Sequence, residues 1–175
     1  MPFTPFHMGP ALALKAVSGR YFSVLMFGIA QVAMDIEPLI GMIRDADVLH
    51  GWTHTYVGAT LIALIVTIIA PPLCRLILVR WNFELEHHSI GWLGSHSSIG
   101  WVAASTGAFI GTYSHVALDS IMHADMTPLW PWYKSNELLG VISIGDLHAV
   151  CVVAGVFGVV AWFALGLRAR RQRLA

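Results

Sequence analysis

Residues 55–74 read TYVGATLIALIVTIIAPPLC, a run of 20 positions without a charged side chain. A helix rises about 1.5 Å per residue and the hydrocarbon core of a bilayer is about 30 Å thick, so a helix of this length can cross it. A second run, AVCVVAGVFGVVAWFALGL at residues 149–167, holds 19 uncharged residues. These two runs predict membrane-spanning helices and decide the fold class.

Three further segments complete the predicted bundle. Residues 97–114 are uncharged and lead on to Asp119, whereas residues 21–34 form a shorter run that ends at Asp35. The shorter run spans a membrane only if Asp35 lies at the far face. Residues 8–17 are apolar but short, and we expect a helix that runs partway through the membrane and forms a hairpin with the next helix.

Proline is expected to interrupt the helix that begins near residue 55. Pro71 and Pro72 lack the amide hydrogen that a helix interior needs, so they should end or kink that helix. We therefore predict an all-α fold, an integral membrane bundle of four to five helices, in a single membrane-embedded domain over residues 1–175.

The composition agrees with a membrane environment. Hydrophobic residues make up 57% of the chain and charged residues 11%, whereas soluble domains carry about 25% charged residues. Membrane lipid must therefore cover much of the surface. The formal net charge is zero, so no nucleic-acid partner is expected.

Basic residues set the predicted orientation. The tail at residues 168–175 contains four arginines and should be cytoplasmic, because cytoplasmic segments are enriched in lysine and arginine. Arg75 and Arg80 fall on the same side in this topology, and Arg44 is an exception. The chain is thus predicted to cross the membrane several times with a cytoplasmic C-terminus.

Side chains that can bind metals gather at the opposite, outer face in this topology. Ionisable groups close to hydrocarbon are costly, so their presence there indicates a function. The candidates are His7, Asp35, Glu37, His50, His54, His115, Asp119, His123, Asp146 and His148.

The spacing of these residues favours a metal site. His50 and His54 are four residues apart, as are His115 and Asp119, and on a helix such pairs share one face. His123 extends the second pair by another turn. Mixed histidine and carboxylate ligands suit one or two divalent ions, zinc above all, with manganese or iron as alternatives.

Each group also has a simpler interpretation. Asp35 with Glu37 can be a helix end at the interface, and His115 can form a structural hydrogen bond with Asp119. Asp146 ends the sequence SIGD, which resembles a capping box at the start of the last helix. His148 can be an interfacial histidine.

Four motifs appear in one order along the chain, and the resemblance that they carry covers roughly residues 3–130: MPFTPFH (1–7), DIEP (35–38), HGWTH (50–54) and GTYSHVALDS (111–120). Together they resemble the LexA-binding, inner-membrane-associated metal-dependent hydrolases, which are distantly similar to zinc-dependent phospholipase C. This chain departs from that pattern in having Met34 before the first acid and Glu37 as the second. The resemblance implies an inner-membrane location and a metal site formed by His7, Asp35, His50, His54, His115 and Asp119.

The leading hypothesis is a membrane-bound metal-dependent hydrolase that acts on phosphoester bonds of a lipid or lipid-linked substrate. In it, Asp35 and Glu37 are the catalytic candidates, and Glu37 serves as a general base or orients a ligand. His123, His148 and Asp146 are additional candidates. The alternative is a non-catalytic membrane subunit that binds a membrane protein partner. A b-type haem protein is disfavoured, because nearby carboxylates do not help to hold haem iron.

Overall fold

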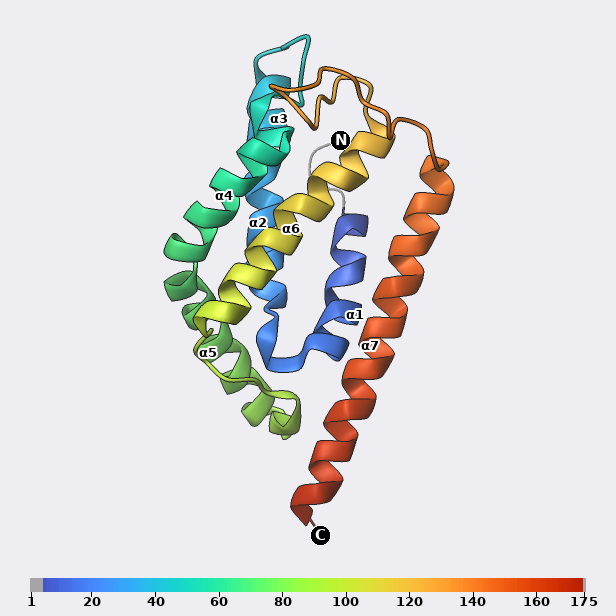
Figure 1. Ribbon diagram of the computed structural model, residues 1–175. Helices are drawn as coiled ribbons and strands as arrows, with labels where there is room; N and C mark the ends of the chain where they lie inside the picture. Colours follow the sequence, from blue (N-terminus) through green and yellow to red (C-terminus); the bar gives the residue numbers. More distant parts are fainter. Residues whose placement is uncertain (1–4, 175) are drawn as a thin grey trace.

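The computed structural model describes residues 5–174, which form helices joined by turns and loops without a strand (Figure 1). The all-α prediction is confirmed. In chain order the elements are η1 (Pro5–Met8), α1 (Gly9–Ser18), η2 (Gly19–Tyr21), α2 (Val24–Met34), α3 (Ile36–Ile43), η3 (Trp52–His54), α4 (Tyr56–Ile69), α5 (Pro71–His87), η4 (Gly91–Leu93), α6 (Trp101–Met122) and α7 (Ile144–Leu174).

Two of the predicted helices are divided. The second ends at Met34 with Asp35 as its C-cap, as predicted, but the backbone at Asp35 stays near helical angles (φ −72°, ψ −7°) and α3 follows directly. The third ends at Ile69 and restarts as α5 at Pro71, and the two parts are bent by 57°. This break confirms the effect predicted for the proline pair.

Hydropathy identifies fewer crossings than the sequence suggested. Among the described residues, Val24–Ile43 and Ile144–Gln172 are long and apolar enough to cross a membrane, and the bent pair α4–α5 would make a third span. α6 has 22 residues but is not in this set. Its serine, threonine and glycine residues make it less apolar, and they lie where other helices pack against it. Membrane association is therefore supported, whereas a crossing by α6 is not.

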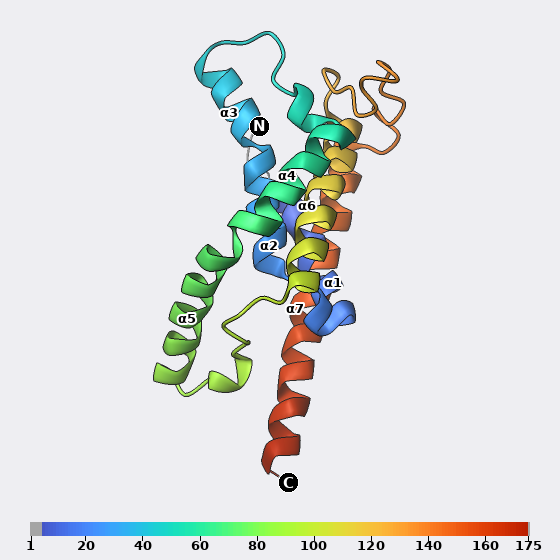
Figure 2. The same ribbon diagram turned by 60° about the vertical axis from the view of Figure 1, so that its left-hand side comes forward.

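α6 packs against both α2 and α4, and glycines allow the close approach to α2 (Figures 1 and 2). A Cβ atom on Gly107 would lie 2.5 Å from the carbonyl oxygen of Ser23, and one on Gly111 would lie 2.8 Å from that of Phe27. Such spacing of small residues is typical of helix packing in membranes, where close backbone contact replaces hydrophobic burial.

α1 packs chiefly against α7 rather than α2. The predicted turn between α1 and α2 is present as η2. The close backbone contact of α1, however, is with α7, because a Cβ atom on Gly158 would lie 2.4 Å from the backbone nitrogen of Ala13. The hairpin prediction is thus right about the turn and wrong about the main partner.

The ends that carry the predicted ligands lie together. In Figure 1, η1, the α2–α3 junction, the start of α4, the end of α6 and the start of α7 are all at the upper end, opposite the C-terminus. The arginine-rich end of α7 is therefore far from the candidate site.

Candidate metal centre

Six buried side chains form what we call the inner cluster. They fall into three overlapping groups in which one potential ligand atom per residue lies within 4.8 Å of the others. All six were predicted as metal ligands, and the structure brings them together from five segments of the chain. The groups are His7 with His115 and Asp119, Asp35 with His54 and His115, and His50 with His54 and Asp119.

Asp119 is the centre of these contacts. Its Oδ2 lies 3.1 Å from Nε2 of His115 and 3.6 Å from Nε2 of His54, and its Oδ1 lies 3.6 Å from Nε2 of His7. Oδ1 of Asp35 lies 3.5 Å from the same His115 nitrogen. Neighbouring ligands around a tetrahedral zinc ion, with bonds of about 2.0–2.1 Å, are about 3.4 Å apart. These separations match that edge length.

His115 and Asp119 converge as the sequence predicted, because four residues on α6 make slightly more than one turn. The pair His50 and His54 converges in another way. His50 lies in a loop and His54 ends η3, so the predicted α-helical spacing is wrong, although the two rings are only 4.9 Å apart. Thr55 explains the difference, because its hydroxyl accepts the backbone N–H of Gly58 and starts α4 after His54.

Gln31 fixes the tautomer of His115. Its amide nitrogen is 3.0 Å from the carbonyl oxygen of Gly111, which can only accept a hydrogen bond. The amide oxygen must then accept from Nδ1–H of His115, 2.6 Å away. In the neutral ring, Nε2 of His115 is then the nitrogen without a hydrogen, and it faces Asp119 in the inner cluster.

Thr53 and Glu37 hold His54 in a similar way. Oε2 of Glu37 accepts hydrogen bonds from the backbone N–H of Thr53, at 3.1 Å, and from its hydroxyl. The hydroxyl oxygen then accepts from Nδ1–H of His54 at 3.0 Å. Glu37, predicted as a catalytic residue, thus lies on the outer side of His54 and belongs to none of the three groups.

Asp125 holds His50 and was missed by the sequence analysis. Its Oδ1 accepts from Nδ1–H of His50 at 2.9 Å, and its Oδ2 accepts the backbone N–H groups of Leu49 and His50. Burial alone would raise the pKa of Asp125, but these hydrogen bonds outweigh it and lower the pKa to about 2. The acid two residues after His123 was the only sequence signal, and sequence alone could not show that it contacts a loop 75 positions earlier.

The three additional candidates have separate positions. The ring of His123 stacks on that of His50 at 4.2 Å, and His123 forms a half-buried group with His50 and Asp125. Asp146 is exposed, and its carboxylate accepts from the hydroxyl of Ser143, which in turn accepts the backbone N–H of Asp146. Ser143 thus caps the start of α7, and Asp146 contacts this cap, which agrees with the simpler interpretation of Asp146. His148 stacks on Phe6 at 4.3 Å.

The inward nitrogens lack hydrogen bonds. In the described part of the chain, the buried Nε2 atoms of His7, His54 and His115 have no hydrogen-bond partner, although carboxylate oxygens are close. Burial lowers the pKa of His7 to about 4 and also lowers the pKa of His54, so both imidazoles are neutral at pH 7. Lone pairs that face carboxylates repel them unless a cation lies between. These buried groups could hold a metal ion.

Histidine with carboxylate ligands is a donor set that divalent zinc, manganese and iron accept, so the residues present fit the predicted ion. The predicted resemblance to membrane-bound hydrolases remains a prediction. Comparison with protein-family models, curated proteins and solved structures finds no match to this chain.

Proposed function

We propose that the protein is a membrane-bound metal-dependent hydrolase that acts on phosphoester bonds of a lipid or lipid-linked substrate. The observation that carries this proposal is the convergence on Asp119 of the Nε2 atoms of His7, His54 and His115, which are buried and have no hydrogen-bond partner among the described residues. A cluster that served only to stabilise the fold would be expected to hydrogen-bond these buried nitrogens, because an unpaired buried polar group costs about 1–3 kcal/mol.

The inner cluster would hold one or two divalent ions, and zinc fits its donors best. His7, His50, His54, His115 and Asp119 are the proposed ligands. Asp119 offers two oxygens that face different histidines, and either oxygen could bind an ion.

A bound divalent ion would polarise a phosphoryl oxygen and bring the pKa of water from about 15.7 to about 7. Two acidic residues of the chain, Asp35 and Glu37, would assist this ion. Asp35, which is 6% exposed, can complete the ligand set or accept a proton beside His115. Glu37 keeps His54 in the tautomer that faces inward, through Thr53, and so positions a ligand rather than contacting the substrate.

The position of the cluster favours a substrate with a lipid anchor. It lies near the first residues of α4 and α7, and we place this end of the bundle near the level of lipid headgroups. We place this end at the outer face of the inner membrane, with the arginine-rich C-terminus in the cytoplasm, since positive residues favour the cytoplasmic side.

Metal content tests the first half of the proposal. The protein is purified without chelator, and metals are measured by inductively coupled plasma mass spectrometry for the wild type and for His54→Ala with Asp119→Ala. His87→Ala with His88→Ala is the control, because both are exposed at the end of α5. We expect metal in the wild type and the control and almost none in the cluster variant. Equally low metal content in all three proteins would contradict the proposed metal site.

Hydrolysis tests the second half. Vesicles that contain phosphomonoester and phosphodiester lipids are incubated with the protein, and released phosphate or phosphorylated headgroup is quantified. Activity should disappear with a chelator and return when zinc is added. Metal binding without hydrolysis of any of these lipids would contradict the catalytic step.

The second candidate, a non-catalytic membrane subunit, is favoured by one observation. α5 leans away from the other helices (Figure 2) and exposes Leu73, Leu76 and Phe83 by 52%, 69% and 62%. A partner helix could cover this face. The discriminating result is stable co-purification with another membrane protein that persists when His50 and His54 are both replaced by alanine.

A further inference from the structure

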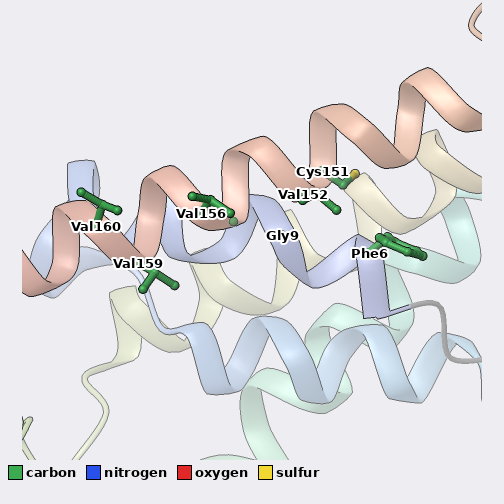
Figure 3. Close-up of a pocket in the computed structure, with 8 residues that line it drawn as sticks. Phe6, Gly9, Cys151, Val152, Val156, Val159 and Val160 are labelled. Carbon is green, nitrogen blue, oxygen red and sulfur yellow. The ribbon is translucent and has the colours of Figure 1, made fainter.

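An apolar groove runs along the seam between η1, the first residues of α1, and α7. It has a volume of about 350 Å³, within the range of about 300–1,000 Å³ that is typical of small-molecule sites. Figure 3 shows the valines of α7 along it and Phe6 at its end near η1. The residues that line it include Phe6, Gly9, Val152, Gly155, Val156 and Val160.

The groove exists because glycines form its floor. A Cβ atom on Gly9 would lie 2.0 Å from the carbonyl oxygen of Cys151, and one on Gly155 would lie 3.3 Å from Cα of Gly9. The two backbones therefore touch, and no side chain projects from the seam. Four valines of α7, Val152, Val156, Val159 and Val160, line the groove.

The groove faces the region that lipid chains occupy. It lies on the segment Ile144–Gln172, which can cross a membrane and has only 11% of its most apolar window buried. Val156 and Val160 are 60% and 62% exposed, and no charged residue lines the groove. Its natural contents in a bilayer are hydrocarbon chains.

One end of the groove is formed by Phe6, which precedes His7 of the inner cluster. Phe6 also stacks on His148, which lies one helical turn before Val152. The residue after Phe6 is His7, whose Nε2 is 3.6 Å from Asp119. A molecule with a hydrocarbon chain joined to a phosphate would match both features, because a phospholipid places its phosphate next to the origin of its acyl chains.

We propose that this groove binds an acyl chain of a phospholipid and so places the phosphate of that lipid at the inner cluster. The inference deepens the proposed function and rests on it for the role of the phosphate. It names the substrate class as a phospholipid with a long chain, rather than a soluble phosphoester.

Photo-crosslinking tests the groove directly. The protein is placed in nanodiscs that contain phosphatidylcholine with a diazirine on one acyl chain, irradiated, digested and mapped by mass spectrometry. Val156→Trp fills the groove, whereas Val153→Trp is a matched control on the same helix at a residue that is 67% exposed and outside the groove. We expect labelling around residues 152–160 to fall at least fivefold in Val156→Trp and to change less than twofold in Val153→Trp. Thermal unfolding confirms that each variant folds, and Val160→Trp replaces Val156→Trp if it does not.

Two outcomes would overturn the groove as a lipid site. One is equal labelling in the groove variant and the control. The other is loss of labelling that is replaced by crosslinks between two copies of the chain, which would make the groove a dimer interface.

The double variant His54→Ala with Asp119→Ala separates this inference from the proposed function. If the wild type contains no metal but the groove is labelled in both proteins, the acyl-chain site stands and the hydrolase is wrong. If the wild type contains metal but labelling does not respond to Val156→Trp, the metal site stands and the acyl-chain site is wrong.

Discussion

The contact between Gln31 and His115 gives the sharpest test of the candidate metal centre. Gln31 lies on α2, is 4% exposed, and contacts the face of His115 that points away from the inner cluster. Gln31→Met keeps the length and burial of the side chain but removes the hydrogen-bond acceptor. Without that acceptor, the imidazole of His115 can rotate or change tautomer, although the substitution alters no atom of the inner cluster.

The expected effect has two parts. Nδ1–H of His115 would lose its partner in a buried place, which should lower the free energy of unfolding by about 1–3 kcal/mol. Loss of the outer partner of a histidine ligand typically reduces metal affinity by about 10–100-fold. At about 1.4 kcal/mol per tenfold, this is about 1.4–2.8 kcal/mol of binding free energy.

The assay is competition for zinc with a chelator of known affinity, with thermal unfolding measured on the metal-free protein. Thr67→Val is the control, because Thr67 is 2% exposed and its hydroxyl has no hydrogen-bond partner among the described residues. Thr67→Val should change neither the zinc affinity nor the thermal unfolding of the metal-free protein much.

Gln31→Glu separates the two roles of Gln31. The carboxylate still accepts from His115 but no longer donates to the carbonyl oxygen of Gly111, so stability should fall while most of the metal affinity remains. Unchanged zinc affinity in Gln31→Met, in a protein that does bind zinc, would refute the argument about the tautomer of His115.

Two further predictions concern other contacts. Asp125→Asn should reduce zinc affinity about tenfold, measured by the same competition, because it weakens the acceptor that holds the outer nitrogen of His50. Gly111→Ala should lower the unfolding free energy by about 1–3 kcal/mol, since its new Cβ would lie 2.8 Å from a carbonyl oxygen of α2. Gly100→Ala, where nothing lies within 4 Å of the new atom, should leave thermal unfolding nearly unchanged, and equal effects at the two glycines would contradict the packing argument.

The parts of the fold that the sequence predicted depend on local properties. Charge-free runs and the proline pair are visible in one stretch of chain, and they identified the helices and the break after Ile69. The pair His115 and Asp119 was predictable for the same reason, because helical periodicity alone places both residues on one face. The gathering of the site at one end followed from counting the helices between the motifs.

The parts that sequence could not predict depend on contacts between distant segments. Gln31 and His115 are 84 positions apart, and an apolar helix that contains one glutamine gives no sign of its partner. Asp125 reaches His50 from a loop whose path has no periodicity. The conformation of HGWTH (50–54) was predicted wrongly because the capping hydroxyl of Thr55 competes with a helix that begins earlier.

The distribution of hydrogen bonds in the inner cluster distinguishes a ligand site from a structural polar core. The outward nitrogens of three histidines have partners on separate elements: Gln31 for His115, Thr53 for His54 and Asp125 for His50. A structural core would gain by turning those rings so that their inner nitrogens also found acceptors, because a partly satisfied network in a dry place is costly. Instead the outer partners accept hydrogen bonds from the outward nitrogens of His54 and His115, and the inward nitrogens have no hydrogen-bond partner among the described residues. The fold thus gathers imidazole nitrogens and carboxylate oxygens in a buried place, an arrangement that could hold a metal ion.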